Sequence, residues 1–263
     1  LNGLSMSFTR TSVSTLYESY LQGLMLGTPL ESVEVDGEIS LAISWHQGID
    51  DQVQLSLHDI NMEDEAGNFA MYGLSGHLDW QATGRSAPTQ FQWSGASVYT
   101  LNIGASQVSG QFNEDRFLLS EPISIPLLDG VLSVGEFEVE GIGVMPSWHM
   151  SGALSPVSME ALCLALGWPS FSGTLAGSIS GLNYKNDEVT MNGAMVMRVF
   201  DGEVLIQQLQ LLHPFDVVPE LRANVDARNL DLEQLTRAFS FGNIQGKLDG
   251  HVHNLILQSW APV

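Results

Sequence analysis

Hydrophobic and polar residues alternate strictly over long stretches of the chain. In residues 33–45 the odd positions are apolar or Gly, as at Ile39, Leu41 and Ile43, whereas the even positions are acidic, Ser or Ala. A period of two places apolar side chains on one face of a strand and acids on the other. Further alternating stretches occur at residues 53–57, 91–93, 99–103, 175–179, 189–199 and 221–227. The pattern predicts a mainly β fold with a long, curved antiparallel sheet that has one apolar and one polar face.

Turn-forming residues and shifts of phase separate these stretches. Clusters of Gly, Asn and Asp at 65–68 and 186–187 predict hairpin turns. The apolar positions change from odd to even between Leu57 and Ile60 and again after Gly73, which predicts β-bulges or strand ends. A strand over residues 33–45 would be about 43 Å long at roughly 3.3 Å per residue, about twice the usual length. The apolar stripes could form a closed sandwich or barrel core or line an open groove, and this length is a point in favour of the groove.

Three segments break the alternation and predict short helices. Residues 16–25 follow Thr15, with Glu18 three positions on as in a capping box. The other two are residues 159–166 after Ser158 and residues 232–239 after Asp231. Helices this short are marginal in isolation, so we expect each to pack its apolar side against the apolar face of the sheet, covering that face in part.

The last two helices belong to an internal repeat. A shift of 73 residues, without gaps, aligns unit 158–182 with unit 231–255, including Gly173 and Gly177 with Gly246 and Gly250. We expect these glycines to leave room for the preceding helix. The chain therefore divides into a β-rich half (1–157) with the N-terminal helix and a helix-plus-strand repeat region (158–263), within one continuous sheet.

Charge and cysteine content narrow the classes of function. The 263 residues include 30 acidic and 9 basic side chains, for a net charge of −21. This balance argues against nucleic acid and anionic membrane surfaces as partners. The single cysteine, Cys163, excludes an intramolecular disulfide, a zinc cluster and an iron–sulfur site built from this chain. Because the sequence starts at Leu1 and stops directly after a strand-like run, we expect it to be a piece of a longer protein.

Candidate catalytic and metal-binding groups are few. Asp249, His251 and His253 would share one strand face and could present three ligands to a metal. Their counterparts in the other repeat unit are Ala and two Ser, which favours a plain solvated face. Acidic pairs lie in turns or on the polar face, Cys163 lies inside an apolar helix, and no phosphate loop or nucleophile motif occurs. We therefore expect no enzyme activity, no catalytic residues, no cofactor and no metal.

The C-terminal region carries a family resemblance. Residues 229–235 (NLDLEQL), 239–250 (FSFGNIQGKLDG), Leu255, Trp260 and Pro262 form a pattern similar to the C-terminal region of the YdbH-like family, within the AsmA-like and TamB-like envelope proteins. The specific part covers roughly residues 158–263. The resemblance implies a protein of the periplasmic side of the inner membrane, anchored by an N-terminal helix outside this sequence. It also implies a β-groove that conducts phospholipid between the inner and outer membranes.

Together, the pattern and the resemblance predict a non-enzymatic periplasmic lipid-transport module of the cell envelope. Acyl chains of phospholipid, or of another acyl-chain ligand, would contact the apolar groove. Its predicted lining is Ile39, Leu41, Ile43, Ile179, Met191, Met195, Met197 and Val252. Three alternatives stay open: a scaffold that binds a partner envelope protein through sheet edges, an enzyme acting on envelope polymers, and a dicarboxylate-transport protein, as an older family label has it.

Overall fold

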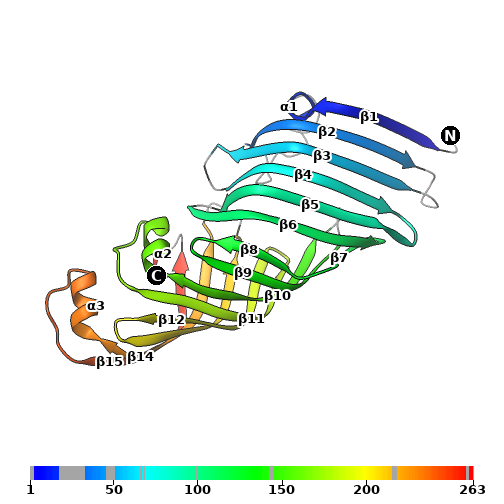
Figure 1. The fold of residues 1–263 in the computed structure, drawn as a ribbon. Helices are drawn as coiled ribbons and strands as arrows, with labels where there is room; N and C mark the ends of the chain where they lie inside the picture. The colour runs from blue at the N-terminus through cyan, green and yellow to red at the C-terminus, as the bar shows by residue number, and fades with distance from the viewer. Residues whose placement is uncertain are drawn as a thin grey trace. The chain divides into compact units, whose positions relative to one another are not determined.

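The chain folds as a mainly β protein with three short helices, as predicted (Figure 1). The computed structural model describes residues 3–17, 33–45, 51–65, 67, 69–98, 100–141, 145–214, 218–258 and 261–262. The strands are β1 (Leu4–Ser12), β2 (Val33–Trp45), β3 (Gln52–Asp64), β4 (Phe69–Gln81), β5 (Arg85–Val98), β6 (Leu101–Asn113), β7 (Arg116–Leu119), β8 (Ile123–Leu127), β9 (Gly130–Glu140), β10 (Ser147–Ser158), β11 (Gly173–Lys185), β12 (Glu188–Val199), β13 (Gly202–Leu212), β14 (Glu220–Asp231), β15 (Lys247–Gln258) and β16 (Ala261–Pro262). The helices are α1 (Val13–Leu16), α2 (Met159–Leu166) and α3 (Leu232–Ala238).

The described strands form one 16-stranded antiparallel sheet. The hydrogen-bonded order follows the chain from β1 to β7 and from β9 to β16, and β8 pairs with both β6 and β9. The chain divides into two compact units. Unit 1 comprises Leu1–Ile125 and Glu138–Val144, and unit 2 comprises Pro126–Phe137 and Met145–Val263. The division at residue 158 in the sequence follows the internal repeat and marks a different boundary.

The turns and phase shifts of the sequence are visible in the backbone. Asn186 and Asp187 have φ values of 52° and 61° between β11 and β12, which is the left-handed pair of a two-residue hairpin turn. The register of β3 against β4 shifts between Leu57 and Ile60, and the residue between them, Asp59, has a φ of 51°. Because the bulge adds one residue, Leu57 and Ile60 can both keep to the apolar face. The bulge prediction is confirmed.

Bulges with a left-handed residue recur in both units. Besides Asp59, the residues Arg10, Gln208, Asn229 and Asn254 have φ values between 45° and 56° at register shifts of their strands. Four of these five residues donate the backbone N–H to a polar side chain of the neighbouring strand. The pairs are Arg10 with Ser40 Oγ (3.0 Å), Asp59 with Ser75 Oγ (2.9 Å), Asn229 with Asp249 Oδ1 (2.7 Å) and Asn254 with Asn224 Oδ1 (2.9 Å).

Helices α2 and α3 confirm the predicted positions and caps. The Ser158 side chain accepts a hydrogen bond from the N–H of Ala161, and the Asp231 side chain accepts one from Gln234. Most of the predicted helix 16–25 lies outside the described residues. Its predicted cap is wrong, because α1 begins at Val13 and Thr15 lies inside it.

Both helices pack into one hydrophobic cluster of unit 2. From α2 the buried members are Met159 and Cys163, both with 0% exposure, and they meet Val199, Phe200 and Val204 of the β12–β13 hairpin. Leu235, Ala238 and Phe239, from α3 and its C-terminal end, pack against the same cluster. Figure 1 shows both helices at the same end of this sheet. The cluster therefore fixes the two repeat units to each other.

The glycine prediction holds at the first glycine of each repeat unit and is wrong at the second. A Cβ at Gly173 would lie 3.2 Å from Met159 Cγ of α2, and a Cβ at Gly246 would lie 3.7 Å from Leu232 Cδ1 of α3. A Cβ at Gly177 would overlap Met195 Sδ of the adjacent strand, so the space there is taken by a strand side chain and not by α2. A Cβ at Gly250 would have nothing within 4 Å.

Candidate functional site

The apolar face of unit 1 is built from rows of side chains that cross the strands. Residues directly opposite each other in antiparallel strands point to the same face. Ile43 faces Val53, Leu41 faces Leu55, and Ile39 faces Leu57, which joins the predicted residues of β2 to β3. Two full rows across β1–β4 are Met6, Ile43, Val53 and Trp80, and Phe8, Leu41, Leu55 and Leu78.

Unit 2 carries a longer set of such rows. Row A runs across β10–β14 through Val157, Leu175, Met197, Val204 and Ala227. Row B runs across β10–β15 through Leu154, Gly177, Met195, Ile206, Val225 and Val252. Row C contains Met150, Leu182 and Met191. Row D runs through Trp148, Tyr184, Val189, Leu211, Leu221 and Leu257.

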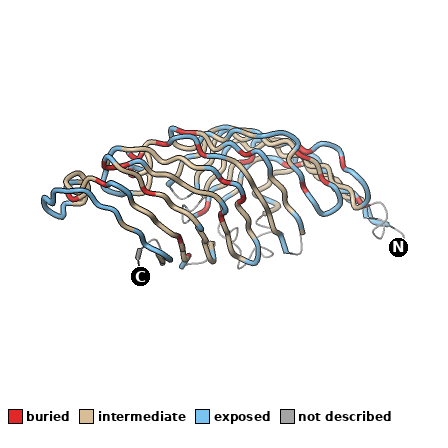
Figure 2. The backbone as a smooth tube through the Cα atoms, turned by 90° about the horizontal axis from the view of Figure 1, so that it is seen from below, coloured by how far each residue is buried: buried red, intermediate tan, exposed pale blue. Residues whose placement is uncertain are grey.

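The helices pack on one end of this apolar face. The strand residues packed against the helix cluster come from rows A and B: Leu175, Met197, Ile206, Val225 and Ala227. Row D lies at the other end of the strands, and all six of its side chains are half-buried. Figure 2 shows this condition along the strands, where the intermediate colour predominates and buried positions are scattered. The predicted partial cover by short helices is therefore what the described residues show.

The exposed area agrees with an incompletely covered sheet. The chain exposes 15250 Å². One compact globule of 28.6 kDa would expose about 11,300 Å², and two separate globules of half that mass would together expose about 13,600 Å². The exposed area of the chain is larger than either value.

The predicted lining residues fall into three exposure classes. Ile39, Ile179 and Met191 are buried, at 6–8% exposure. Leu41, Ile43, Met195 and Met197 are half-buried, and Val252 is 49% exposed on β15, next to the two-residue strand β16. The half-buried and exposed members are those an apolar ligand could contact directly. The three buried members support them from within the sheet.

The rows contain side chains that the sequence reading missed. Ile206 and Val225 continue the row of Met195, and Trp148 stacks on Tyr184 with ring centroids 5.9 Å apart in row D. Ile206 escaped notice because the alternation of its strand is interrupted at Gln207 and Gln208. Gln208 has a φ of 51° and marks a bulge. The change of phase at the polar pair Gln207–Gln208 was the sequence signal for this bulge.

The candidate metal ligands on β15, Asp249, His251 and His253, make other contacts in the structure. Asp249 Oδ1 accepts the N–H of Asn229 at 2.7 Å. His251 and His253 share one face, with ring centroids 5.1 Å apart. In the part of the chain that the structure describes, no group of three His, Cys, Asp or Glu side chains is placed to hold a metal ion. The role visible for Asp249 is structural.

Three of the seven arginines, Arg116, Arg222 and Arg237, lie in ion pairs with glutamates. Arg222 Nη2 lies 2.6 Å from Glu220 Oε1, and Arg237 Nη2 lies 2.5 Å from Glu233 Oε1. Hydrogen bonds from Gln258 and Arg222 hold the pKa of Glu220 below its usual value. An incoming anion would have to compete with these carboxylates for the guanidinium groups.

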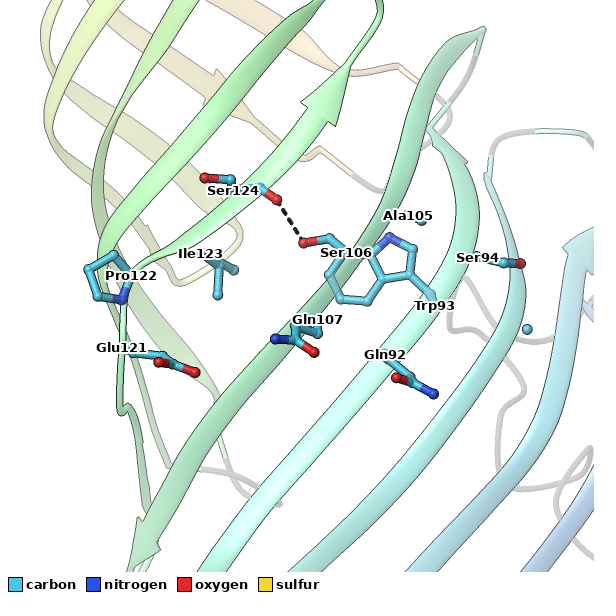
Figure 3. A pocket seen from close by; sticks show the side chains of 11 residues that line it. Gln92, Trp93, Ser94, Ala105, Ser106, Gln107, Glu121, Pro122, Ile123 and Ser124 are labelled. Atoms are coloured by element: carbon cyan, nitrogen blue, oxygen red, sulfur yellow. Dashed lines mark hydrogen bonds between the residues drawn. The ribbon is translucent and has the colours of Figure 1, made fainter.

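Unit 1 also contains a pocket of mixed character, shown in Figure 3. It lies between β5, β6 and residues 121–124. The Trp93 Nε1–H donates to the carbonyl of Gly104 at 3.0 Å, and Ser106 Oγ donates to the carbonyl of Ser124 at 2.8 Å. These two hydrogen bonds join β5 to β6 and β6 to β8. They occupy the indole N–H of Trp93 and the hydroxyl of Ser106. The amides of Gln92 and Gln107 border the pocket.

The arrangement supports binding by apolar contact. Rows A to D consist of aliphatic, Met, Gly and aromatic residues and offer no carboxylate, imidazole or amine to a guest. Cys163 has 0% exposure, and burial raises the pKa of its thiol, so it is a packing residue of α2. Within the described residues, no helix is both long and apolar enough to cross a bilayer. Comparisons with protein-family models, curated proteins and solved structures found no match.

Proposed function

We propose that this chain is a non-enzymatic module that binds the acyl chains of phospholipid on the apolar face of its sheet. In line with its resemblance to YdbH-like envelope proteins, it would act in the periplasm as part of a protein anchored in the inner membrane, passing lipid towards the outer membrane. The mechanism is passive. Each CH₂ group that moves from water onto the apolar rows contributes about 0.8 kcal/mol, so an acyl chain needs no specific polar contact to bind.

One observation carries the proposal: apolar side chains continue from strand to strand in rows that the described helices cover at one end only. In row D of unit 2, six half-buried side chains from six consecutive strands, β10 to β15, lie side by side. A solvent-exposed surface of this kind is unfavourable unless a ligand or partner covers it. Met150, Met195 and Met197 add flexible side chains that can repack around different acyl chains.

The experiment has two arms. Purified protein is extracted with organic solvent and the extract is analysed by mass spectrometry, where we expect phospholipid in stoichiometric amount. In cells, a photo-crosslinking amino acid is placed at Leu41 in unit 1 and at Met195 in unit 2, and both positions should label lipid. The matched controls are Glu38 on β2 and Arg198 on β12, which are exposed and lie on the opposite faces of the same strands.

Labelling at the two control positions together with silence at Leu41 and Met195 would reverse the assignment of the faces. Absence of lipid from both arms would refute acyl-chain binding altogether.

A second candidate, a scaffold that binds a partner protein through a sheet edge, is favoured by one observation. β1 stands first in the hydrogen-bonded order of the described strands, and its Leu4 and Met6 are 69% and 52% exposed. Crosslinking at Met6 separates the two functions, because Met6 lies in the same row as Ile43 but on the outermost described strand. A protein adduct at Met6 without lipid adducts at Leu41 would favour the scaffold.

A further inference from the structure

The loops that follow α2 and α3 present large apolar side chains to solvent. Trp168 is 52% exposed in the first loop, and Phe241 and Ile244 are 76% and 52% exposed in the second. Leu164, on the outer side of α2, is 85% exposed. We call these four residues the helix-end patch. Elsewhere in unit 2, large apolar side chains are mostly half-buried in rows, so this patch needs its own explanation.

The backbone holds the two aromatic residues in the same way. Trp168 N–H donates to the carbonyl of Cys163, and Phe241 N–H donates to the carbonyl of Thr236, both over 2.9 Å. Trp168 and Phe241 are aligned by the shift of 73 residues, and so are Cys163 and Thr236. The outward aromatic residue is therefore a feature of the repeat unit and not an accident of one loop.

Phe241 also stands on a rigid base. Its ring stacks on Phe239 with centroids 6.1 Å apart, and Phe239 contacts Phe171 at 5.8 Å within the hydrophobic cluster of α2 and α3. Because both helices join this cluster, the two loops emerge at the same end of the unit 2 sheet, as Figure 1 shows. The exposed ring of Phe241 is thus held by packed neighbours, at the same end of the sheet from which the loop of Trp168 emerges.

The charge of the two loops differs from that of the chain. Residues 167–172 (GWPSFS) and 239–246 (FSFGNIQG) contain no charged side chain, although the chain has 30 acidic residues and a net charge of −21. A protein partner selected by such an acidic chain would bring basic groups, and these loops have no acid to meet them. Uncharged loops with exposed Trp, Phe and Ile instead suit the interface of a bilayer, where aromatic side chains settle among the headgroups.

We propose that the helix-end patch inserts into the headgroup region of a zwitterionic lipid bilayer and docks this end of unit 2 on a membrane. This goes beyond the binding of single acyl chains by the sheet, since it uses different residues. The acidic remainder of the chain is repelled by anionic lipid, so zwitterionic membranes should bind best at low salt.

The test is flotation of the purified protein with phosphatidylcholine vesicles. We expect the native chain to float with the vesicles, with a partition that added salt leaves unchanged. Replacing part of the phosphatidylcholine by phosphatidylglycerol should weaken binding at low salt, and high salt should restore it. Trp168→Ser and Phe241→Ser should each lower the partition constant about tenfold, because each removes a large apolar side chain from the interface.

The matched control is the double variant Val98→Ser with Leu118→Ser, which removes two exposed apolar side chains of unit 1, 45% and 39% exposed. It should float like the native chain. Phe241→Trp keeps an interfacial aromatic and should bind at least as well, with fluorescence that brominated lipid quenches. This variant keeps the test decisive if a serine variant folds poorly.

Three results would overturn the proposal: flotation that the patch variants do not reduce, brominated lipid that quenches Phe241→Trp no more than the native chain, or patch variants that change only the sedimentation equilibrium of the protein. The last result would assign the patch to contact with a second copy. Lipid recovered by solvent extraction from the patch variants would show that acyl-chain binding on the sheet survives, so the two proposals can fail separately.

Discussion

The backbone N–H of Asn229 on β14 donates a hydrogen bond to Oδ1 of Asp249 on β15, over 2.7 Å. Asn229 has a φ of 54° and lies at a bulge where the register of the two strands shifts between Ala227 and Leu230. The bulge withdraws this N–H from the regular ladder, and the carboxylate replaces the missing carbonyl acceptor. Asp249 therefore serves the strand pairing that keeps Ala227 and Leu230 on the apolar face.

Asp249→Ala should destabilise unit 2 by about 1 kcal/mol, since it leaves the Asn229 N–H without its acceptor. Asp249→Asn keeps an Oδ1 acceptor and should stay close to the native chain. The measurement is the free energy of unfolding, obtained from a urea titration that is monitored by far-ultraviolet circular dichroism. His251→Ala, two positions along the same face, is the matched control and should have little effect. An equal loss for Asp249→Asn and Asp249→Ala would contradict the acceptor role.

Gly177 and Gly250 occupy aligned positions of the two repeat units but have opposite surroundings. A Cβ at Gly177 would overlap Met195 Sδ and lie 3.0 Å from the Ala194 carbonyl oxygen, whereas at Gly250 it would meet nothing within 4 Å. Gly177→Ala should therefore cost about 1–3 kcal/mol of unfolding free energy. Gly250→Ala should be neutral or slightly stabilising, because alanine restricts the unfolded chain.

Thermal and urea unfolding of both glycine variants test this expectation, with Gly250→Ala as the control. Combining Gly177→Ala with Met195→Ala should recover part of the loss specific to Gly177, since the overlapping sulfur is removed. If the two glycine variants were equally stable, the packing of Met195 on Gly177 would be wrong.

The sequence was sufficient for the strands because the period of two sets which side chains share a face. The predicted strand 33–45 is β2, and helix 159–166 is α2, since alternation and the Ser158 cap are local signals. The role of Gly177 was not predictable in this way. It depends on Met195, a residue on another strand whose register is set by a bulge, and sequence spacing within one strand does not contain that information.

The candidate site was predictable only in part, for a similar reason. Leu41 and Met195 were found because they lie in clean alternation. Their partners across the strands were missed, or not joined to them, because Arg10 and Gln208 change the phase of β1 and β13. Arg and Gln rarely take the left-handed conformation, so the residue type itself gave no signal of a bulge. The acceptors Ser40 and Ser75 looked like ordinary polar-face residues.

The cap of the α3 helix should be sensitive to acid. Asp231 caps α3, and its hydrogen bond from the Gln234 N–H, with help from Lys247, holds its pKa below the ordinary value. A carboxyl whose pKa is lower in the folded state stabilises the fold at pH values above its unfolded pKa of about 3.9. This stabilisation is lost as the pH falls through the lowered, folded-state pKa. Ser158, the cap of α2, carries no titratable group, but its N–H donates to Asp129 Oδ1, and the hydrogen bonds with Ser158 lower the pKa of that carboxyl, so α2 has an acid response of its own.

Hydrogen exchange followed by mass spectrometry between pH 5 and pH 2 tests this, once exchange rates are corrected for their intrinsic pH dependence. Peptides covering α3 should lose protection at the acidic end of this range. Asp231→Asn keeps a side-chain oxygen at the cap and should remove the pH dependence specific to α3. An unchanged acid response of α3 in Asp231→Asn would assign the effect to other carboxylates.

Cys163 should be chemically inert in the folded protein. Its side chain has 0% exposure, and burial raises the pKa of its thiol, with a smaller contribution from the Glu160 charge in the same direction. Because the thiolate is the reactive species, both effects slow alkylation. At pH 8 iodoacetamide should label Cys163 slowly, and labelling in denaturing urea should be at least about a hundredfold faster, as mass spectrometry can follow.

A cysteine introduced at Leu164, the exposed neighbour on α2, should react at the rate of the unfolded chain. Rapid native labelling of Cys163, with Leu164→Cys in a Cys163→Ala background as reference, would show that α2 does not stay packed on the β12–β13 hairpin. The cluster that fixes the two repeat units would then be looser than its buried side chains indicate.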